Sequence, residues 1–116
     1  PGTARTIRRA VRLITESAAL PKVSQLASQL GSSERQLRRG FDHVVGVSPK
    51  HYLRIVRFRR ALRSARAVRA PDWAEIADRE GYFDQAHLIG DFRALTGMTP
   101  CALISMRPRP LRHSVR

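Results

Sequence analysis

Cysteine is almost absent from this sequence, which has one thiol, Cys101, in 116 residues. A single cysteine forms neither an internal disulfide nor a thiolate zinc site, so both kinds of crosslink are excluded. No hydrophobic run approaches the ~18 residues of a membrane-spanning helix, and no secretory hydrophobic core is present. These shortages argue against a disulfide-stabilised scaffold and a membrane span, and a reducing cytoplasm is the expected compartment.

Catalytic and metal-binding patterns are also lacking. The sequence has no carboxylate pair placed for acid–base chemistry, no Ser/His/Asp or Cys/His order of known spacing, and no phosphate-binding glycine loop. Four histidines lack the close spacing of metal ligands: His43, His51, His87 and His113. We therefore predict that the protein is not an enzyme and needs no metal or other cofactor.

Acidic residues are scarce, with 9 Asp and Glu against 22 Lys and Arg, and the net charge is +13. Residues 1–69 contain 16 basic and 3 acidic side chains, residues 70–106 contain 2 and 6, and residues 107–116 add four arginines. A basic field confined in this way fits a polyanionic partner, either nucleic acid or an anionic membrane surface. Solubility combined with GC-rich coding, which favours Arg over Lys, is the alternative explanation.

Glycine, proline and capping residues divide the sequence into helical segments, and no alternating β-pattern is found. Helices are predicted before Pro21, over 23–30, 33–46, 49–68, 73–80 and 84–96, and from Thr99 onward. Pro21 is expected in the first turn of the second helix. Capping boxes are predicted for Ser33 with Gln36 and for Asp72 with Glu75. The predicted fold class is all-α, with about seven helices.

Apolar residues at helical spacing predict the buried face of each longer helix. These faces are Ile7, Val11, Ile14 and Ala18; Leu37, Phe41, Val44 and Val45; Tyr52, Ile55, Phe58, Leu62 and Ala65; and Leu88, Phe92 and Leu95. Arg59, Arg63 and Arg66 lie on a different, solvent-facing stripe of the helix over 49–68.

One pattern occurs twice in the chain. Matching residues lie 50 apart at first and 51 apart later: Leu26 and Ile76, Ala27 and Ala77, Gly31 and Gly81, then Leu37 and Leu88, Phe41 and Phe92, Gly46 and Gly97, Pro49 and Pro100. A small residue where two helices cross, a glycine at the turn and an apolar anchor are typical of a helix-turn-helix. We expect two helix-turn-helix subdomains (1–48 and 69–106), a linker helix (49–68), and a basic tail (107–116) that is disordered.

The repeated Phe-x4-Gly-x-(Ser/Thr)-Pro pattern and the stretch GYFDQAHLIGDFRALTGMTP resemble the DNA-binding domain of AraC/XylS-type bacterial transcription regulators. The resemblance covers roughly residues 5–106. It implies seven helices and two recognition helices, 33–46 and 84–96, inserted into successive major grooves of double-stranded DNA. Because the chain starts without Met, we expect a sensor or dimerisation domain outside it, and RNA polymerase is a further candidate partner.

Exposed residues near the start of each recognition helix are the candidate base readers. Candidate base contacts are Arg35, Gln36, Arg38 and Arg39 in the first helix, and Gln85, Ala86 and His87 in the second. Arginine pairs with guanine, glutamine pairs with adenine, and an alanine methyl contacts the thymine methyl. By position, the family's usual base readers correspond to Arg35, Arg38 and Arg39. Candidate backbone contacts are Ser33, Lys50, His51, Arg54 and Arg93.

The second recognition helix departs from the family pattern. Gly90 stands where members often have Arg or another polar residue, and the neighbouring Asp91 is expected to repel phosphate. We therefore predict that the first copy specifies the sequence and the second mainly positions the domain.

Two other functions are compatible with the charge. The first is a basic helical module that binds an acidic protein or RNA without sequence-specific DNA recognition. The second is peripheral membrane binding, which is disfavoured because the apolar stripe of the linker helix is needed for the core.

Overall fold

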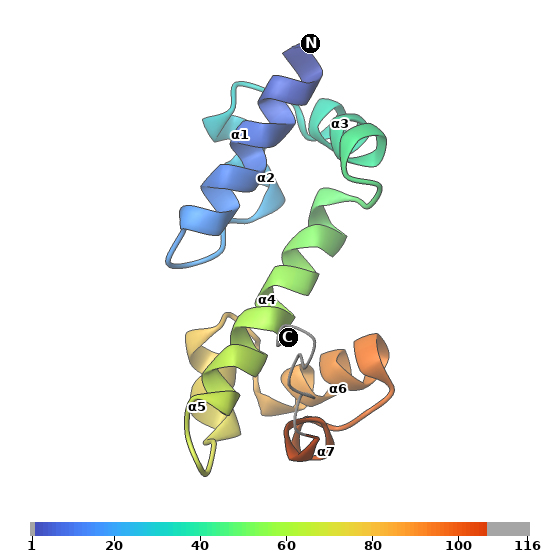
Figure 1. Cartoon of the computed structure of the whole chain (residues 1–116). Coiled ribbons are helices and arrows are strands. Elements are labelled where there is room, and N and C mark those ends of the chain that lie inside the picture. Colours follow the sequence, from blue (N-terminus) through green and yellow to red (C-terminus); the bar gives the residue numbers. More distant parts are fainter. Residues whose placement is uncertain (1, 107–116) are drawn as a thin grey trace, which may run out of the picture. The chain divides into compact units, whose positions relative to one another are not determined.

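The computed structural model describes residues 2–106, which form seven helices and no strand (Figure 1). The helices are α1 (Gly2–Glu16), α2 (Val23–Gln29), α3 (Glu34–Val44), α4 (Pro49–Arg66), α5 (Trp73–Arg79), α6 (Gln85–Thr96) and α7 (Pro100–Ser105). The predicted all-α fold is therefore confirmed. The segment 107–116, for which we expected disorder, lies outside the described residues.

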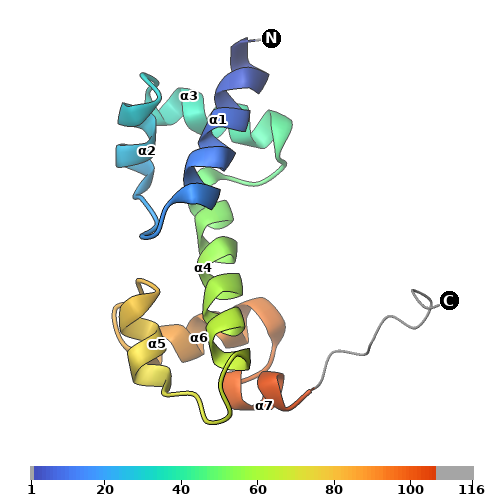
Figure 2. The same cartoon turned by 60° about the vertical axis from the view of Figure 1, so that its left-hand side comes forward.

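The chain divides into two compact units, the first ending at Arg60 and the second beginning at Ala61. The first unit contains α1, α2, α3 and the larger part of α4, and the second contains the end of α4 with α5, α6 and α7 (Figure 2). Each unit holds one copy of the repeated helix pair, α2–α3 or α5–α6, and the two helices of each pair contact each other. The helix expected to be a linker thus contributes residues to both units.

The core of the first unit forms where α1 and α2 pack against α3. Its buried residues are Ile7, Ala10, Ile14, Leu26, Ala27, Leu37, Phe41 and Leu53. Gly40 allows α1 to approach α3 closely, because a Cβ at this position would lie 2.6 Å from Ile7 Cδ1. Phe41 extends the core toward α4, where its ring centroid lies 5.6 Å from that of Tyr52.

Two expectations about the ends of the first helices are wrong. α1 stops before Ala18, which lies in a bend and is exposed. The Arg60 guanidinium donates to the carbonyl oxygens of Ile14 and Ala18 at 3.0 and 3.2 Å, and it therefore satisfies acceptors that a longer helix would have used. Pro21 lies outside α2, because Lys22 is the N-cap residue of that helix.

The predicted buried face of α3 is wrong at one position. Val44 is 44% exposed. The buried side of α3 instead follows Leu37, Gly40 and Phe41, at i, i+3 and i+4 spacing. Gly40, which no hydrophobicity pattern would select, therefore belongs to the packed face of α3.

The predicted apolar stripe of α4 is only partly confirmed. Of its five members only Ala65 is fully buried, and the other four are half-buried. Leu53 and Ala61 are buried instead. Leu53 belongs to the first unit and Ala61 to the second, so the helix meets two cores and no single stripe runs along it.

The core of the second unit centres on Leu88 and Phe92 of α6, both fully buried. Trp73 of α5 packs edge-on against Phe92, with ring centroids 6.0 Å apart. Ile76 and Ala77 of α5 are buried beside them, as the repeat predicted.

The turns inside the two helix pairs share one hydrogen-bonding pattern. Gly31 and Gly81 follow α2 and α5 with positive φ angles of 65° and 89°. In each turn the N–H of the next residue donates to a carbonyl oxygen five residues earlier at 2.9 Å, Ser32 to Ala27 and Tyr82 to Ala77. This hydrogen bond requires a residue in the left-handed backbone conformation, which glycine adopts without strain. The first part of the predicted repeat is therefore confirmed.

The second turn is one residue longer than the first. Ser33, the N-cap of α3, follows Ser32 directly, whereas Phe83 is inserted between Tyr82 and Asp84, the N-cap of α6. The inserted residue explains why the repeat spacing changes from 50 to 51.

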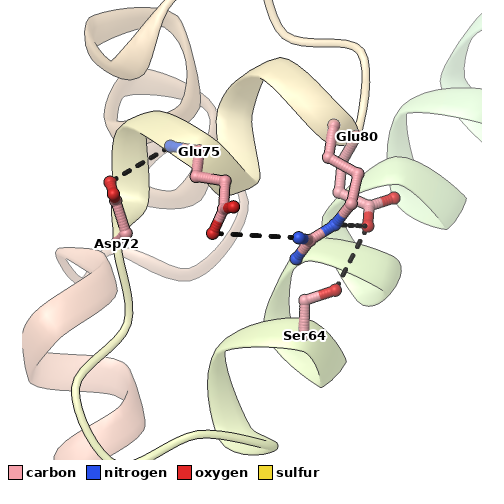
Figure 3. A network of polar contacts seen from close by, with 5 residues as sticks. Ser64, Asp72, Glu75 and Glu80 are labelled. Atoms are coloured by element: carbon pink, nitrogen blue, oxygen red, sulfur yellow. Dashed lines mark hydrogen bonds and ion pairs between the residues drawn. The ribbon is translucent and has the colours of Figure 1, made fainter.

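A polar network joins the end of α4 to α5 within the second unit (Figure 3). Ser64 Oγ donates to Glu80 Oε2 at 3.1 Å, and Arg79 Nε lies 3.6 Å from the same oxygen. Asp72 caps α5 by accepting from the Glu75 N–H at 3.2 Å. The Glu75 carboxylate lies 4.0 Å from Arg79 Nη1, so the predicted reciprocal capping box is only half formed.

Gly90→Ala is expected to raise the free energy of unfolding by about 0.5–1 kcal/mol. Gly90 lies in the interior of α6, is exposed and has nothing within 4 Å of a built Cβ, so alanine gains helix propensity without a clash. Chemical denaturation monitored by circular dichroism measures the change in the free energy of unfolding. Gly40→Ala is the contrasting variant: its methyl group meets buried Ile7, and it is expected to destabilise the protein. A stabilising effect at Gly40 would contradict the close packing of α1 on α3.

Candidate nucleic-acid interface

The start of α3 is fixed by a complete capping box. Ser33 Oγ accepts from the Gln36 N–H at 3.0 Å, and Gln36 Oε1 accepts from the Ser33 N–H at 3.0 Å. Ser32 Oγ also lies 3.4 Å from Gln36 Oε1. The predicted box is confirmed, and it has a consequence for the site. The acceptor oxygen of Gln36, a candidate base reader, is used inside the protein.

Three arginines gather on the exposed side of α3. Arg35, Arg38 and Arg39 line a shallow, open hollow of about 450 Å³ together with Asp42 and Ser48. All three side chains are exposed, and within residues 2–106 none of them makes a hydrogen bond or an ion pair. Their guanidinium donors are therefore available to an external acceptor. In the major groove of DNA, the acceptor pair that matches a guanidinium group is N7 and O6 of guanine.

The start of α6 is organised around His87. Asp84 Oδ1 accepts from the His87 N–H at 2.8 Å, and the Phe83 N–H donates to His87 Nδ1 at 3.0 Å. The Tyr82 ring lies edge-on to the imidazole, with centroids 5.3 Å apart. With Nδ1 acting as an acceptor, Nε2 is the nitrogen of neutral His87 that carries hydrogen and can donate outward. Gln85 and Ala86 are exposed in the same turn.

Helices α3 and α6 differ in chemistry at matching positions. At the offset of 51, the α3 arginines correspond to residues without polar side chains, Arg35 to Ala86, Arg38 to Ile89 and Arg39 to Gly90. Only one cation, Arg93, is present in α6. At these positions α6 therefore lacks the guanidinium donors that α3 presents.

Asp91 does not lie where the sequence suggested. We expected it to repel phosphate from the exposed side of α6, but it is 7% exposed and lies on the buried side of the helix. It follows Gly90 by one residue, and one residue turns a helix by about 100°, which separates a core position from an outer one.

The candidate backbone contacts are divided between the units. Ser33 caps α3, Lys50 is exposed in the first turn of α4, His51 and Arg54 are half-buried in its first two turns, and Arg93 is exposed on α6. The first four belong to the same unit as the α3 arginines. Only Arg93 belongs to the second unit.

The sequence patterns gave no role to Arg60 or to a group of four arginines on α1. Arg60 caps the end of α1 from α4, and a contact across 42 to 46 residues leaves no local signal. The group of four is exposed on the side of α1 opposite its buried residues: Arg5, Arg8, Arg9 and Arg12. Their spacing of three and four residues could have revealed this face. It adds to the basic field of the first unit.

Metal clusters and membrane-spanning helices are absent from the described part of the chain. Residues 2–106 contain no cluster of three His, Cys, Asp or Glu side chains that could hold a metal ion. No helix described here has both the length and the apolar character needed to cross a membrane.

Comparison with known proteins identifies relatives of this chain. A family model described as a helix-turn-helix domain matches residues 26–106. The probable thc operon regulatory protein of Rhodococcus erythropolis is 32% identical over 97 residues, covering 81% of this chain and 29% of that protein. The chain thus spans less than a third of the length of this curated relative.

Two solved structures share the fold. A transcriptional regulator from Chromobacterium violaceum, from the AraC-type DNA-binding domain-containing proteins, has a TM-score of 0.79 at 23% identity, covering 95% of this chain and 98% of that one. The DNA-binding domain of the global transcriptional factor AdpA, solved with a target DNA, has a TM-score of 0.74 at 25% identity, covering 86% and 90%. With the family match over 26–106, these findings show that the chain belongs to the AraC-type helix-turn-helix family, the DNA-binding domains of transcription regulators.

Proposed function

We propose that this chain binds double-stranded DNA sequence-specifically, with α3 and α6 as recognition helices in successive major grooves. The single observation that carries the proposal is the set of three exposed arginines on α3, Arg35, Arg38 and Arg39, which have no partner within the described residues. Arginine paired with guanine is the commonest base-specific contact in DNA complexes. AdpA, which shares the fold, was solved in complex with a target DNA.

Within this function, α3 is the stronger base reader and α6 mainly positions the domain. The counterparts of the α3 arginines in α6 are Ala86, Ile89 and Gly90, none of which offers a hydrogen-bond donor from its side chain. Residues 1–60 contain 13 basic and 3 acidic side chains, whereas residues 61–106 of the second unit contain 5 and 6. Arg79 is engaged with Glu80 and Glu75, so Arg93 of α6 is the cation beside this helix that remains for phosphate. The electrostatic part of binding should therefore come mainly from the first unit.

The remaining candidate contacts have supporting roles in this proposal. In α3, Gln36 keeps its amide NH₂ for DNA while its oxygen serves the cap. Ser33, Lys50, His51 and Arg54 contact phosphates around α3, and Arg93 does so beside α6. Gln85, Ala86 and His87 are the base-facing residues of α6.

We also propose that the chain acts as part of a larger transcription regulator in the cytoplasm, associated with the nucleoid. Its curated relative is an operon regulatory protein more than three times as long as the matched segment. A sensor or dimerisation domain and RNA polymerase are the further partners of this proposal. The role is one of binding, without catalysis or a cofactor.

Selection of bound duplexes from a random library tests the proposal and its alternative together. A sequence-specific reader is expected to prefer its selected duplex over random DNA by roughly 10³-fold or more, with affinity that falls steeply as salt rises. The base preferences should be stronger in the half-site that α3 contacts. Binding to all duplexes with equal affinity would reject the proposal, and tighter binding to RNA or to an acidic protein would favour the basic-module alternative.

A further inference from the structure

Phe83 is the most exposed of the large hydrophobic residues in the described chain. Its side chain is 90% exposed, compared with 55% for Val68 and Met106 and 44% for Val44. Isolated apolar residues are common on protein surfaces, so exposure alone assigns no role. The position of Phe83 in the chain and the hydrogen bonds of its backbone distinguish it from these other residues.

Phe83 is the residue by which the second turn exceeds the first. The repeat matches Tyr82 with Ser32 and Asp84 with Ser33, and it leaves Phe83 without a counterpart. The insertion places a phenyl ring directly before the N-cap of α6. This is the end at which a recognition helix approaches the base edges.

The backbone around Phe83 is held on both sides. Its N–H donates to His87 Nδ1 at 3.0 Å, the preceding Tyr82 N–H donates to the Ala77 carbonyl at 2.9 Å, and the following Asp84 caps α6. The Tyr82 ring is buried and lies against His87. The exposed ring is therefore presented from a well-ordered turn, where ordering a contact costs little additional entropy.

The neighbouring residues of α6 favour an apolar ligand group on the DNA. Ala86, Ile89 and Gly90 replace the three arginines of α3, so this end of α6 offers a phenyl ring and a methyl group beside Gln85 and His87. In the major groove, the apolar group on the base edges is the C5-methyl of thymine.

We propose that Phe83 packs against a thymine methyl and gives the half-site of α6 a preference for thymine at one position. The inference deepens the proposed function and rests on it. The complete recognition element then has two chemistries, arginine with guanine at α3 and phenyl with thymine at α6. Phe83 contributes specificity at a position that has no equivalent in the first unit.

Uracil substitution in the selected duplex is the test, because it removes only the thymine methyl. For the full chain, one thymine in the α6 half-site is expected to show about fourfold weaker binding when replaced by uracil, the effect of burying one methyl group. Phe83→Ala should weaken binding about tenfold, the effect expected when roughly 50–60 Å² of apolar surface is no longer buried against the DNA. The same variant should lose that uracil penalty. Phe83→Leu should retain part of it.

Val68→Ala, which removes another exposed apolar side chain of the same unit, is the matched control and should leave affinity and uracil penalties unchanged. Thermal melting should not distinguish Phe83→Ala from the wild type, because the ring contributes little to the core. A uracil penalty that persists undiminished in Phe83→Ala would overturn the inference while leaving the proposed function intact. The absence of any preferred duplex would overturn both.

Protein docking is the competing use of an exposed phenyl ring. If Phe83→Ala keeps full DNA affinity and all uracil penalties but lowers association with RNA polymerase, Phe83 contacts protein and the thymine inference is wrong.

Discussion

Arg39→Ala is expected to weaken binding to the preferred duplex by about 1–3 kcal/mol, or roughly 5- to 150-fold. The Arg39 side chain is exposed in the hollow that it shares with Arg35 and Arg38, and nothing in the described chain pairs with it. Its loss should also relax the preference at one base pair. The measurement is a titration of wild type and variant against duplexes that carry each base at each position, at one salt concentration.

Arg39→Lys separates a base contact from a phosphate contact. Lysine keeps the charge but cannot reproduce the planar, two-donor geometry that guanine accepts. For a base reader, affinity for random DNA should be retained while the preference at one position falls. Retention of the full preference in Arg39→Lys would assign Arg39 to the phosphate backbone.

His87→Ala provides the comparison between α3 and α6, and its cost in binding energy is expected to be smaller than that of Arg39→Ala. Because His87 Nδ1 accepts the Phe83 N–H, part of any loss will come from the turn before α6. His87→Asn, which retains a side-chain acceptor, controls for this contribution. If His87→Ala costs more binding energy than Arg39→Ala, the asymmetry between α3 and α6 is disproved.

Phe41→Ala is expected to lower the free energy of unfolding by about 3–5 kcal/mol, the largest effect on stability among these variants. Phe41 is fully buried between α1, α2 and α4, and its removal also loses the ring contact with Tyr52. A small unit has a total stability of similar size, so the arginines of α3 would lose their support. Urea denaturation monitored by circular dichroism measures the loss of stability, and the binding titration measures the loss of DNA affinity.

Phe92→Ala is the matched change in the second unit, because Phe92 occupies the corresponding position of the repeat and is equally buried. It should destabilise the protein to a comparable extent through the lost contact with Trp73. A cost below about 1 kcal/mol for either phenylalanine would mean that the cavity collapses and that the repeated core residue is not the anchor of its unit.

The candidate site was only partly predictable. Exposure of Arg35, Arg38 and Arg39 follows from the i, i+3 and i+4 positions of Leu37, Gly40 and Phe41, because opposite sides of one helix are set by its period. The same reasoning failed at Asp91, since a carboxylate next to an exposed glycine reads as a surface residue until the packing of α6 is known. Phe83 was visible only as one additional residue in a turn, and its exposure depends on Tyr82 taking the buried place beside it.

Local chemistry alone determined most of the secondary structure and the repeat. Ser33, Asp84 and Thr99 cap their helices, and Gly31 and Gly81 close the turns, because each of these residues acts on backbone within a few positions of itself. The all-α class and the two equivalent helix pairs follow from that local information.

The tertiary structure decided the features that depend on distant contacts. Arg60 ends α1 from more than 40 residues away, Leu53 and Ala61 divide α4 between two cores, and Gly40 is needed because α1 crosses α3 there. A hydrophobic pattern records how apolar each residue is, but not which neighbour it will meet. Burial, caps supplied by another helix and close backbone approaches therefore became known only when the helices were packed.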